Sequence, residues 1–285
     1  MDWPKALIEE LAFRRTIIFL GAGASVACKS EDGSKSPPTW DLLLSKLCNC
    51  IADAEEKTFI TTLIKEKKYL DAAEIIHCSI PPADFTRIVR EEFLAPRYKP
   101  SAIHETVLKI DPKIVITTNY DDIYDNYCRL GDAKSSYNIC KYYDTHLVSD
   151  LRSPIRIIIK AHGCVSDPSK IILTRSQYFQ ERLNHNNFYK ILNALFLTHT
   201  ILFVGYSISD PDIQLLLENA TIAAPSSHPH YAIIPNDLHK SLKTAATKSY
   251  NIQFIEFENG NYAQANELLK KLCEDIQSYR EKYRI

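Results

Sequence analysis

The segment 21–25, Gly-Ala-Gly-Ala-Ser, has the residue types and spacing of a phosphate-binding turn. It follows the apolar run 16–20, and two of the chain's seven glycines lie in it. Small residues let the backbone approach a pyrophosphate, and the free N–H groups of a helix that follows attract its negative charge. The segment therefore predicts a dinucleotide site. The alternative is a tight strand-to-helix turn that needs glycine for steric reasons alone.

Two side chains that could position water or exchange a proton follow later apolar runs. Asn119 lies in the segment 117–122 (TTNYDD), and His162 lies in the segment 160–163 (KAHG). Taken singly, an Asn or Asp here could cap a helix, and a His beside a Gly could be a turn residue. Because the carboxyl ends of parallel strands share one crevice, we expect Asn119 and His162 to lie in the same site.

A second small-residue turn lies in the segment 204–212 (VGYSISDPD). Ser207 could donate a hydrogen bond to a ribose hydroxyl or a phosphate. Ser209 or Asp210 could equally be an ordinary N-cap, with Pro211 at the first helical position. The two interpretations are compatible with each other.

Six apolar, β-rich runs should form the sheet that positions these segments. They are 16–21, 113–118, 155–161, 201–205, 231–236 and 252–258. Continuously apolar strands are expected where helices cover both faces of a sheet. The pattern predicts an α/β, Rossmann-like, doubly wound sheet that is mostly parallel, with helices on both faces.

The interval between the first two predicted strands has helical rather than strand periodicity. Apolar residues recur at helical spacing in 41–54, 57–77 and 83–93, with prolines at 81, 82 and 96. We therefore predict one domain, in which residues 1–40 and 100–285 form the Rossmann-like part and residues 41–99 form an inserted helical subdomain. The amphipathic segment 261–285 is expected to be a closing helix or an oligomer contact.

Composition restricts the class of protein and its partners. The 285 residues can bury a sizeable core, and 34 Lys and Arg against 35 Asp and Glu give no global field for nucleic acid. No run reaches the roughly 18 uncharged apolar residues of a membrane span, and the amino terminus lacks the pattern of a secretory signal. The eight scattered cysteines need not pair. We expect a cytoplasmic protein with neither membrane nor direct nucleic-acid binding.

Five motifs occur in the order found in the sirtuin superfamily. They are GAGAS (21–25), PTW (38–40), TTNYD (117–121), HG (162–163) and GYSISDP (205–211). PTW stands where sirtuins carry a Gly-Ile-Pro-Asp-Phe-like segment, and TTNYD stands where they carry Thr-Gln-Asn-Ile-Asp. The TTNYD and GYSxxDP forms resemble most closely the bacterial sirtuin-like NADases of anti-phage defence.

The resemblance implies a role for each matching residue. The residues that would cradle the NAD phosphates are Gly21, Ala22, Gly23 and Ser25, and those that would contact the adenosine ribose or adjacent phosphate are Gly205 and Ser207. Asn119 would hold the nicotinamide ribose and the attacking water, with Thr118 beside it at the cofactor. Asp121 would help recognise the carboxamide, and His162 would interact with the ribose hydroxyls. Thr39 and Trp40 replace an acidic and aromatic pair of the family, which puts contact by that segment in doubt.

The zinc ribbon of protein-deacylating sirtuins is missing. Those enzymes carry two Cys-x-x-Cys pairs after the His-Gly motif, and a structural zinc site needs four ligands. Here only Cys164 and Cys273 follow His162, and the chain has no Cys-x-x-Cys. Cys48 and Cys50 lie in a helical pattern and are expected in the core. We therefore expect NAD as substrate and neither zinc nor another metal.

These features together imply an NAD+ glycohydrolase that cleaves the nicotinamide–ribose bond to give nicotinamide and ADP-ribose, with Asn119 and His162 as catalytic residues. The same pocket could instead serve an NAD-dependent protein deacylase or an ADP-ribosyltransferase. A non-catalytic sensor of NAD or ADP-ribose is a third hypothesis. Tight binding without turnover would favour the sensor.

Unrestrained NAD hydrolysis would harm the host, so we expect the activity to be controlled. Depletion of NAD in anti-phage defence by abortive infection is the implied role. The sequence resembles the stand-alone sirtuin-like subunit that works beside a HerA-type ATPase. We therefore expect a homo-oligomer, with a large ring among the forms considered, and a HerA-type ATPase as a candidate partner.

Overall fold

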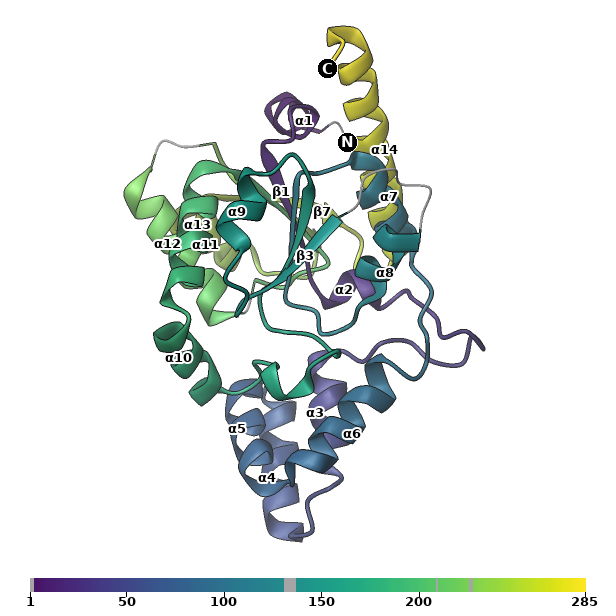
Figure 1. Ribbon diagram of the computed structural model, residues 1–285, viewed down its shortest axis with the longest axis vertical. Helices are drawn as coiled ribbons and strands as arrows, with labels where there is room; N and C mark the ends of the chain where they lie inside the picture. Colours follow the sequence, from purple (N-terminus) through teal and green to yellow (C-terminus); the bar gives the residue numbers. More distant parts are fainter. Residues whose placement is uncertain (1–2, 131–136, 209, 226–227) are drawn as a thin grey trace.

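The sheet has seven strands that all run parallel, and it confirms the predicted α/β, Rossmann-like class (Figure 1). The computed structural model describes residues 3–130, 137–208, 210–225 and 228–285. Along the sheet the strand order is β3-β4-β2-β1-β5-β6-β7. The strands are β1 (Thr16–Leu20), β2 (Ile114–Thr117), β3 (Tyr137–Lys141), β4 (Arg156–Lys160), β5 (Thr200–Val204), β6 (His230–Pro235) and β7 (Ile252–Phe257).

The edge strand β3 is the element that the sequence pattern did not predict. Among the described strands it pairs with β4 alone, and only Tyr137 and Cys140 of its five residues are buried. Such an edge strand lacks the apolar run that marks the other six strands. Its single fully apolar residue, Ile139, lies between Asn138 and Cys140. A search for apolar runs therefore misses it.

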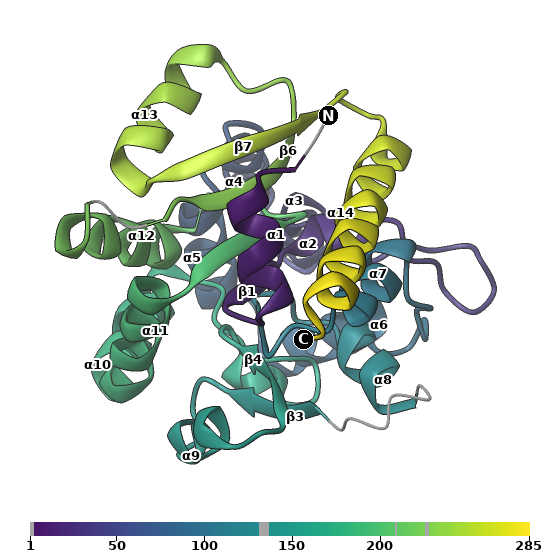
Figure 2. The same ribbon diagram turned by 90° about the horizontal axis from the view of Figure 1, so that it is seen from above.

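Two apolar cores cover the two faces of the sheet. Alternate residues of β1 point to opposite sides: Ile18 and Leu20 pack in one core, Ile17 and Phe19 in the other. The first core is closed by α1 (Lys5–Ala12), α7 (Ala102–Ile110), α8 (Ile123–Leu130) and α14 (Tyr262–Tyr283). The second is closed by α9 (Leu147–Arg152), α10 (Arg175–Asn184), α11 (Asn186–Thr198) and α12 (Pro211–Ala223). Figure 2 shows the two groups on opposite sides of the strands, with α13 (Lys240–Tyr250) beside β7.

A third core belongs to the helices that lie between β1 and β2 in the chain. They are α3 (Trp40–Cys48), α4 (Ala54–Lys65), α5 (Tyr69–Ser79) and α6 (Pro82–Phe93), and they form the lower part of Figure 1. The run 57–77, which had one helical pattern, is divided between α4 and α5 at Lys67, whose φ is +60°. Cys48 is buried in this core and Cys50 packs against it, as expected. The core also includes Val165 and Leu173, from the loop after β4.

The order in which the chain adds strands to the sheet reverses beside β1, and the candidate site lies at this topological switch point. From β1 the strands proceed through β2 toward β3 on one side, and the chain then returns to β5 on the other side. In open parallel sheets, ligands bind at the carboxyl ends of the strands beside such a reversal. The GAGAS turn follows β1 and the GYS turn follows β5, so the two turns are neighbours. Among the described residues no helix is long and apolar enough to cross a membrane.

Candidate active site

One cavity of about 440 Å³ opens at the carboxyl ends of the central strands. This volume is within the usual range of small-molecule sites. Nine of the ten residues predicted for the site line it: Ala22, Gly23, Ser25, Thr118, Asn119, Asp121, His162, Gly205 and Ser207. The tenth, Gly21, contacts the site through its backbone but is not part of the wall. Residues from four separate strand ends are therefore brought together around one space.

The glycines of the two turns allow the backbones to touch. Gly21 N donates to Val204 O at 3.0 Å, and Gly23 N donates to Gly205 O at 2.8 Å. Gly205 has φ +64°, and a Cβ there would lie 2.2 Å from Ala24 N. A Cβ on Gly23 would lie 2.8 Å from Gly205 O. The steric explanation for these glycines is therefore correct. The same close contact between the two turns forms the small-residue wall of the cavity.

The helix at the GAGAS segment is a single turn, α2 (Ala22–Ser25), with Gly21 at its N-cap position. Because the peptide dipoles add along a helix, four residues contribute little of the macrodipole expected from the sequence. A phosphate group here would instead meet individual N–H groups of the turn. Ser25, which is buried at the end of α2, offers a hydroxyl to the same wall.

Asn119 is held against the GAGAS turn by its own amide group. Its Nδ2 donates to Gly21 O at 3.0 Å and to Ser25 Oγ at 3.3 Å. Its backbone N donates to Thr117 Oγ1 at 3.0 Å, and that hydroxyl donates to Leu20 O at 2.8 Å. Within the described part of the chain, no hydrogen bond engages Asn119 Oδ1. The carbonyl oxygen is therefore the atom of this side chain that is left for a ligand or a water molecule.

His162 is almost fully buried and forms a polar cluster with two residues that the sequence did not assign to the site. Its Nδ1 lies 3.3 Å from Tyr178 Oη, and its Nε2 lies 3.3 Å from Asp210 Oδ2. Tyr178 Oη donates to Asp210 Oδ2 at 2.8 Å. Because this hydroxyl has one hydrogen, which is given to Asp210, it accepts from Nδ1–H of His162. Burial, and then Asp210, raise the pKa of Tyr178 well above its ordinary value, which keeps the hydroxyl protonated.

Asp210 joins the site to the helix that follows the GYS turn. Its Oδ1 accepts from Asp212 N at 2.9 Å and from Ile213 N at 3.2 Å, so it is the N-cap of α12. Its other oxygen faces Tyr178 and His162. The predicted N-cap is therefore Asp210, and its contact with His162 is an addition that the sequence did not predict. Ser207, the ligand contact predicted for this segment, lines the cavity. Ser209, the other proposed cap, lies outside the described residues.

Asp121 lines the cavity and also has the structural role considered for it. Its Oδ1 accepts from Ile123 N at 3.1 Å, at the start of α8. Thr118 lines the same part of the wall between β2 and Asn119. The loop from β2 to α8 is thus anchored at both ends, by Thr117 at one end and by Asp121 at the other.

A buried lysine under this loop was not recognised from the sequence. Lys160 Nζ donates to Asp121 O and lies 3.2 Å from Asp125 Oδ2 and 3.5 Å from Asp122 Oδ1. Burial alone lowers the pKa of Lys160, but the three aspartates outweigh it and raise the pKa above its usual value. Burial raises the pKa of Asp125 to about 6, against the opposing effect of Lys160. The sequence offered one indication that Lys160 could contribute to the site: it lies two residues before His162, at the end of the same strand.

The helical segment between β1 and β2 supplies aromatic residues to the wall. Trp40 and Tyr69 have ring centroids 5.4 Å apart, and both line the cavity together with Thr39. The PTW segment, whose contact was in doubt, therefore borders the site. The Trp40 Nε1 and Tyr206 Oη atoms are buried without a hydrogen-bond partner in the described structure. They are two polar atoms in the wall that a bound ligand or water could satisfy.

An apolar end of the cavity was also missed. It is formed where β6, β7 and α14 approach one another, and its residues are Ile233, Ile234, Pro235, Phe257, Tyr262, Ala265 and Leu269. Each stretch had been assigned to an element, but sequence spacing does not reveal that a closing helix borders the ligand space. The arrangement gives the cavity one polar end and one apolar end.

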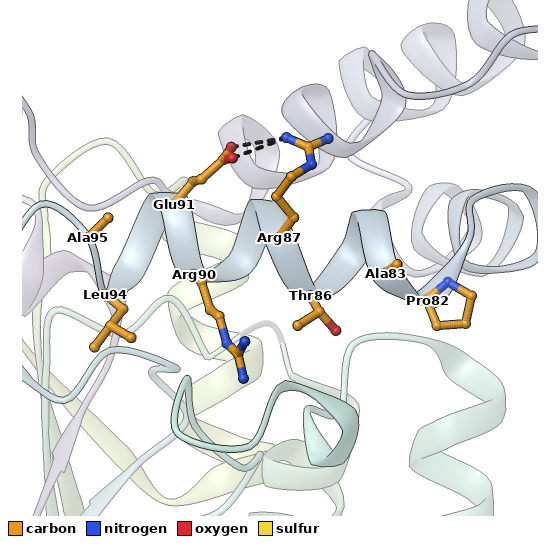
Figure 3. A pocket seen from close by; sticks show the side chains of 8 residues that line it. All are labelled: Pro82, Ala83, Thr86, Arg87, Arg90, Glu91, Leu94 and Ala95. Carbon is orange, nitrogen blue, oxygen red and sulfur yellow. Dashed lines mark hydrogen bonds and ion pairs between the residues drawn. The ribbon is translucent and has the colours of Figure 1, made fainter.

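A separate hollow of about 650 Å³ lies along the outer face of α6 (Figure 3). Arg87 and Glu91 pair there at 3.2 Å and point to one side of the helix, whereas Arg90 points to the other. None of the predicted site residues reaches it. The hollow does not bring together groups that could do chemistry.

Comparisons with known proteins identify the family of this chain. A model of the SIR2-like domain matches residues 113–255, which is half of the chain. The NAD(+) hydrolase ThsA of Enterococcus faecium is 26% identical over 263 residues, 90% of this chain and 50% of that protein. The same-named protein of Bacillus cereus (strain MSX-D12) is 23% identical over 300 residues, 97% of this chain and 57% of that protein.

Defense-associated sirtuin 2 of Bacillus subtilis is 24% identical over 219 residues, 75% of this chain and 20% of that protein. The chain thus spans between a fifth and just over half of the length of these relatives. The matched region contains β2, β4 and β5, with Asn119 and His162 at the ends of the first two. The chain belongs to the family of SIR2-like domain proteins.

Proposed function

We propose that this chain binds NAD+ in the cavity at the strand ends and hydrolyses it to nicotinamide and ADP-ribose. The observation that supports this most strongly is that Asn119, His162 and the GAGAS turn share one cavity. The relatives named NAD(+) hydrolase support the choice of substrate and reaction. In this proposal the phosphates lie along the turn that contains Ala22, Gly23 and Ser25, and Ser207 and Gly205 face the adenosine side.

The reaction needs a positioned nucleophile. Nicotinamide leaves from a cationic ring, so positive charge develops on the ribose carbon as the bond breaks. Asn119 is suited to hold the attacking water or the ribose through Oδ1, since its Nδ2 is engaged by the turn. The bond to Gly21 O means that the amide and the phosphate-binding turn move together, which favours a fixed geometry for attack.

The reaction also needs a group that interacts with the ribose hydroxyls. His162 is suited to this task as a general base. When its ring takes up a proton, the Asp210 carboxylate 3.3 Å away compensates the charge. Tyr178 holds Nδ1 in place, and so fixes the orientation of the ring. Asp121 and Thr118 are proposed to contact the nicotinamide half.

The proposal is tested by measuring nicotinamide release from NAD+ by the purified protein, alone and with candidate activators. Asn119→Ala and His162→Ala are each expected to lower turnover by roughly 10²–10⁴-fold, the usual contribution of such groups. The exposed Asn184→Ala and His228→Ala serve as matched controls and should retain parental activity. Equal activity in all four variants would refute the site, and intact NAD+ under every condition would refute the enzyme.

The same assay distinguishes the alternatives. Turnover that depends on an acylated peptide would indicate a deacylase, and transfer of ADP-ribose to protein would indicate an ADP-ribosyltransferase. Binding of NAD+ or ADP-ribose without any product would indicate a sensor. We favour hydrolysis because the sequence lacks the Cys-x-x-Cys pairs that accompany the acyl-lysine channel.

We propose that residues 41–99 act as an inserted subdomain that closes the nicotinamide side of the cavity. Tyr69 and Phe93 come from this segment and Trp40 borders it, and all three line the cavity. Their aromatic surfaces would exclude water from the bond that breaks. Tyr69→Ala is expected to weaken NAD+ binding while leaving the fold of the sheet intact.

We further propose that the protein works in the cytoplasm, where it depletes NAD in anti-phage defence, and that its activity is restrained by assembly. A homo-oligomer, including a large ring, and a HerA-type ATPase are the candidate controls. Light scattering coupled to size-exclusion chromatography tests the first, and co-purification with turnover measurements tests the second. A monomer at all concentrations would contradict control by oligomerisation.

A further inference from the structure

Three side chains of different metal-binding types meet at the β3 edge of the sheet, outside the cavity. Cys140 is in β3, His146 directly precedes α9, and Asp150 is in α9. Cys140 Sγ lies 3.0 Å from Asp150 Oδ2 and 3.5 Å from His146 Nε2. His146 Nε2 lies 3.3 Å from Asp150 Oδ2. The three ligand atoms thus form a small triangle.

These separations match three corners of a tetrahedral metal site. Zinc binds sulfur at about 2.3 Å, imidazole nitrogen at about 2.0–2.1 Å and carboxylate oxygen at about 2.0–2.2 Å. At tetrahedral angles these bond lengths place the ligand atoms roughly 3.3–3.6 Å apart. Two of the three observed separations fall in this range, and the third is shorter by a few tenths of an ångström. A small rotation of Asp150 would complete the geometry.

The local fold brings the ligands together over a short stretch of chain. His146 and Asp150 are four residues apart, so they lie on the same side of the α9 turn. Cys140 is fully buried, and the Asp150 side chain is only 17% exposed, whereas the His146 side chain is 56% exposed. The triangle is therefore closed on the protein side and open to solvent on the other. An open fourth position of this kind is normally occupied by water.

The charge balance also favours a cation. Among the described residues, Asp150 forms an ion pair with His146 alone and has no lysine or arginine partner. The nearest lysine in the chain, Lys141, donates instead to Ser166 Oγ at 2.9 Å. The neighbouring Asp144 carboxylate is engaged by the backbone N of Lys141 at 2.8 Å. The mostly buried Asp150 carboxylate is thus contacted by the Cys140 thiol and by His146, and in the described structure by no lysine or arginine.

We propose that Cys140, His146 and Asp150 bind one divalent ion of the zinc class, with water as the fourth ligand. The ion would join the edge strand β3 to α9. On binding, Cys140 releases the thiol proton that it now donates to Asp150. None of the three residues lines the NAD cavity. The proposed metal site is therefore separate from the cavity of the proposed hydrolase activity. The sequence analysis expected no metal because the chain lacks the Cys-x-x-Cys pairs of a zinc ribbon. A site with one Cys, one His and one Asp ligand does not need such pairs.

The probe is Co2+, added to the metal-stripped full-length protein. A cobalt–thiolate bond gives a charge-transfer absorption in the near ultraviolet, which should appear with one equivalent of Co2+ and disappear when Zn2+ is added. Cys140→Ser should abolish this absorption. Because His146 is exposed, His146→Ala should leave the fold intact by circular dichroism and weaken Co2+ binding by more than roughly tenfold, since loss of an outer-sphere partner alone costs about that much.

The exposed Cys78 provides the matched control. Cys78→Ser should keep the absorption and the stoichiometry of the parent. Absence of the charge-transfer absorption in the parent would overturn the proposal, and so would an unchanged Co2+ affinity in the His146→Ala and Asp150→Asn variants. Loss of the absorption in Cys78→Ser would assign the metal to an exposed thiol and would also overturn it. If Cys140→Ser does not fold, the His146 and Asp150 variants decide the outcome.

Discussion

Asp210→Asn is the substitution that tests the polar cluster around His162 most directly. Asparagine keeps an Oδ1 that can accept from Asp212 N and Ile213 N, and it is as good an N-cap as aspartate. The start of α12 should therefore be preserved. The change removes the negative charge that faces His162 Nε2, and it replaces Oδ2, the acceptor of the Tyr178 hydroxyl, with an amide group that can only donate. We expect slow turnover in a protein of nearly unchanged stability.

The size of the effect follows from the 3.3 Å separation between His162 Nε2 and Asp210 Oδ2. Two unit charges at this distance interact by about 5 kcal/mol at an effective dielectric constant of about 20. If His162 becomes charged only as the reaction proceeds, this corresponds to a factor of roughly 10³–10⁴ in rate. The Tyr178 hydroxyl also loses its acceptor, which weakens its hold on Nδ1 of His162. We therefore expect kcat to fall by roughly 10²–10⁴-fold, with little change in NAD+ affinity.

The assay is nicotinamide release under conditions in which the parent protein turns over NAD+, together with thermal unfolding and NAD+ binding by calorimetry. Asp53→Asn is the matched control. Asp53 caps α4 through the same pair of bonds, at 2.8 and 2.9 Å, but lies away from the cavity. It should leave kcat unchanged. Turnover of Asp210→Asn within threefold of the parent would refute the role assigned to this carboxylate, whatever the stability of the variant.

Two further predictions concern stability, measured by urea unfolding. Gly205→Ala should lower the free energy of unfolding by at least about 2–4 kcal/mol, because its Cβ would lie 2.2 Å from a facing backbone nitrogen at φ +64°. Gly33→Ala, at φ +76° with no atom within 4 Å, should cost only the conformational term of about 1–2 kcal/mol. Equal costs would contradict the close approach of the two turns. Burial lowers the pKa of His104 and of His230 from 6.5 to about 4. Because the pKa values of these two histidines are lower in the folded than in the unfolded protein, their contribution to the free energy of unfolding is fully present above pH 6.5 and is lost as the pH falls toward 4. Between pH 8 and pH 5 each should account for about 2 kcal/mol of lost stability. His230→Asn should remove about half of this decline and the exposed His228→Asn none of it; an equal decline in both variants would contradict the assignment.

Patterns local in sequence determined much of the architecture. Six strands were predicted because each is an apolar, β-rich run, and in the inner strands this run is continuous, as burial on both faces of a parallel sheet requires. The strand-end positions of Asn119 and His162 followed from the same runs. Because strand ends on one edge share a crevice, their shared cavity could be predicted although 43 positions separate them in the chain. The edge strand β3 escaped because an edge does not need a continuous apolar run.

Only the tertiary structure decided which side chains complete the site. Tyr178 in α10 and Asp210 at the start of α12 meet His162 because two helices pack onto the sheet from different parts of the chain. The apolar end depends on α14, whose residues approach β6 and β7 from the far end of the sequence. Periodicity reports which face of an element is buried, since burial is a local requirement for each residue. It does not report which elements become neighbours, because that is set by how all the buried faces fit together at once.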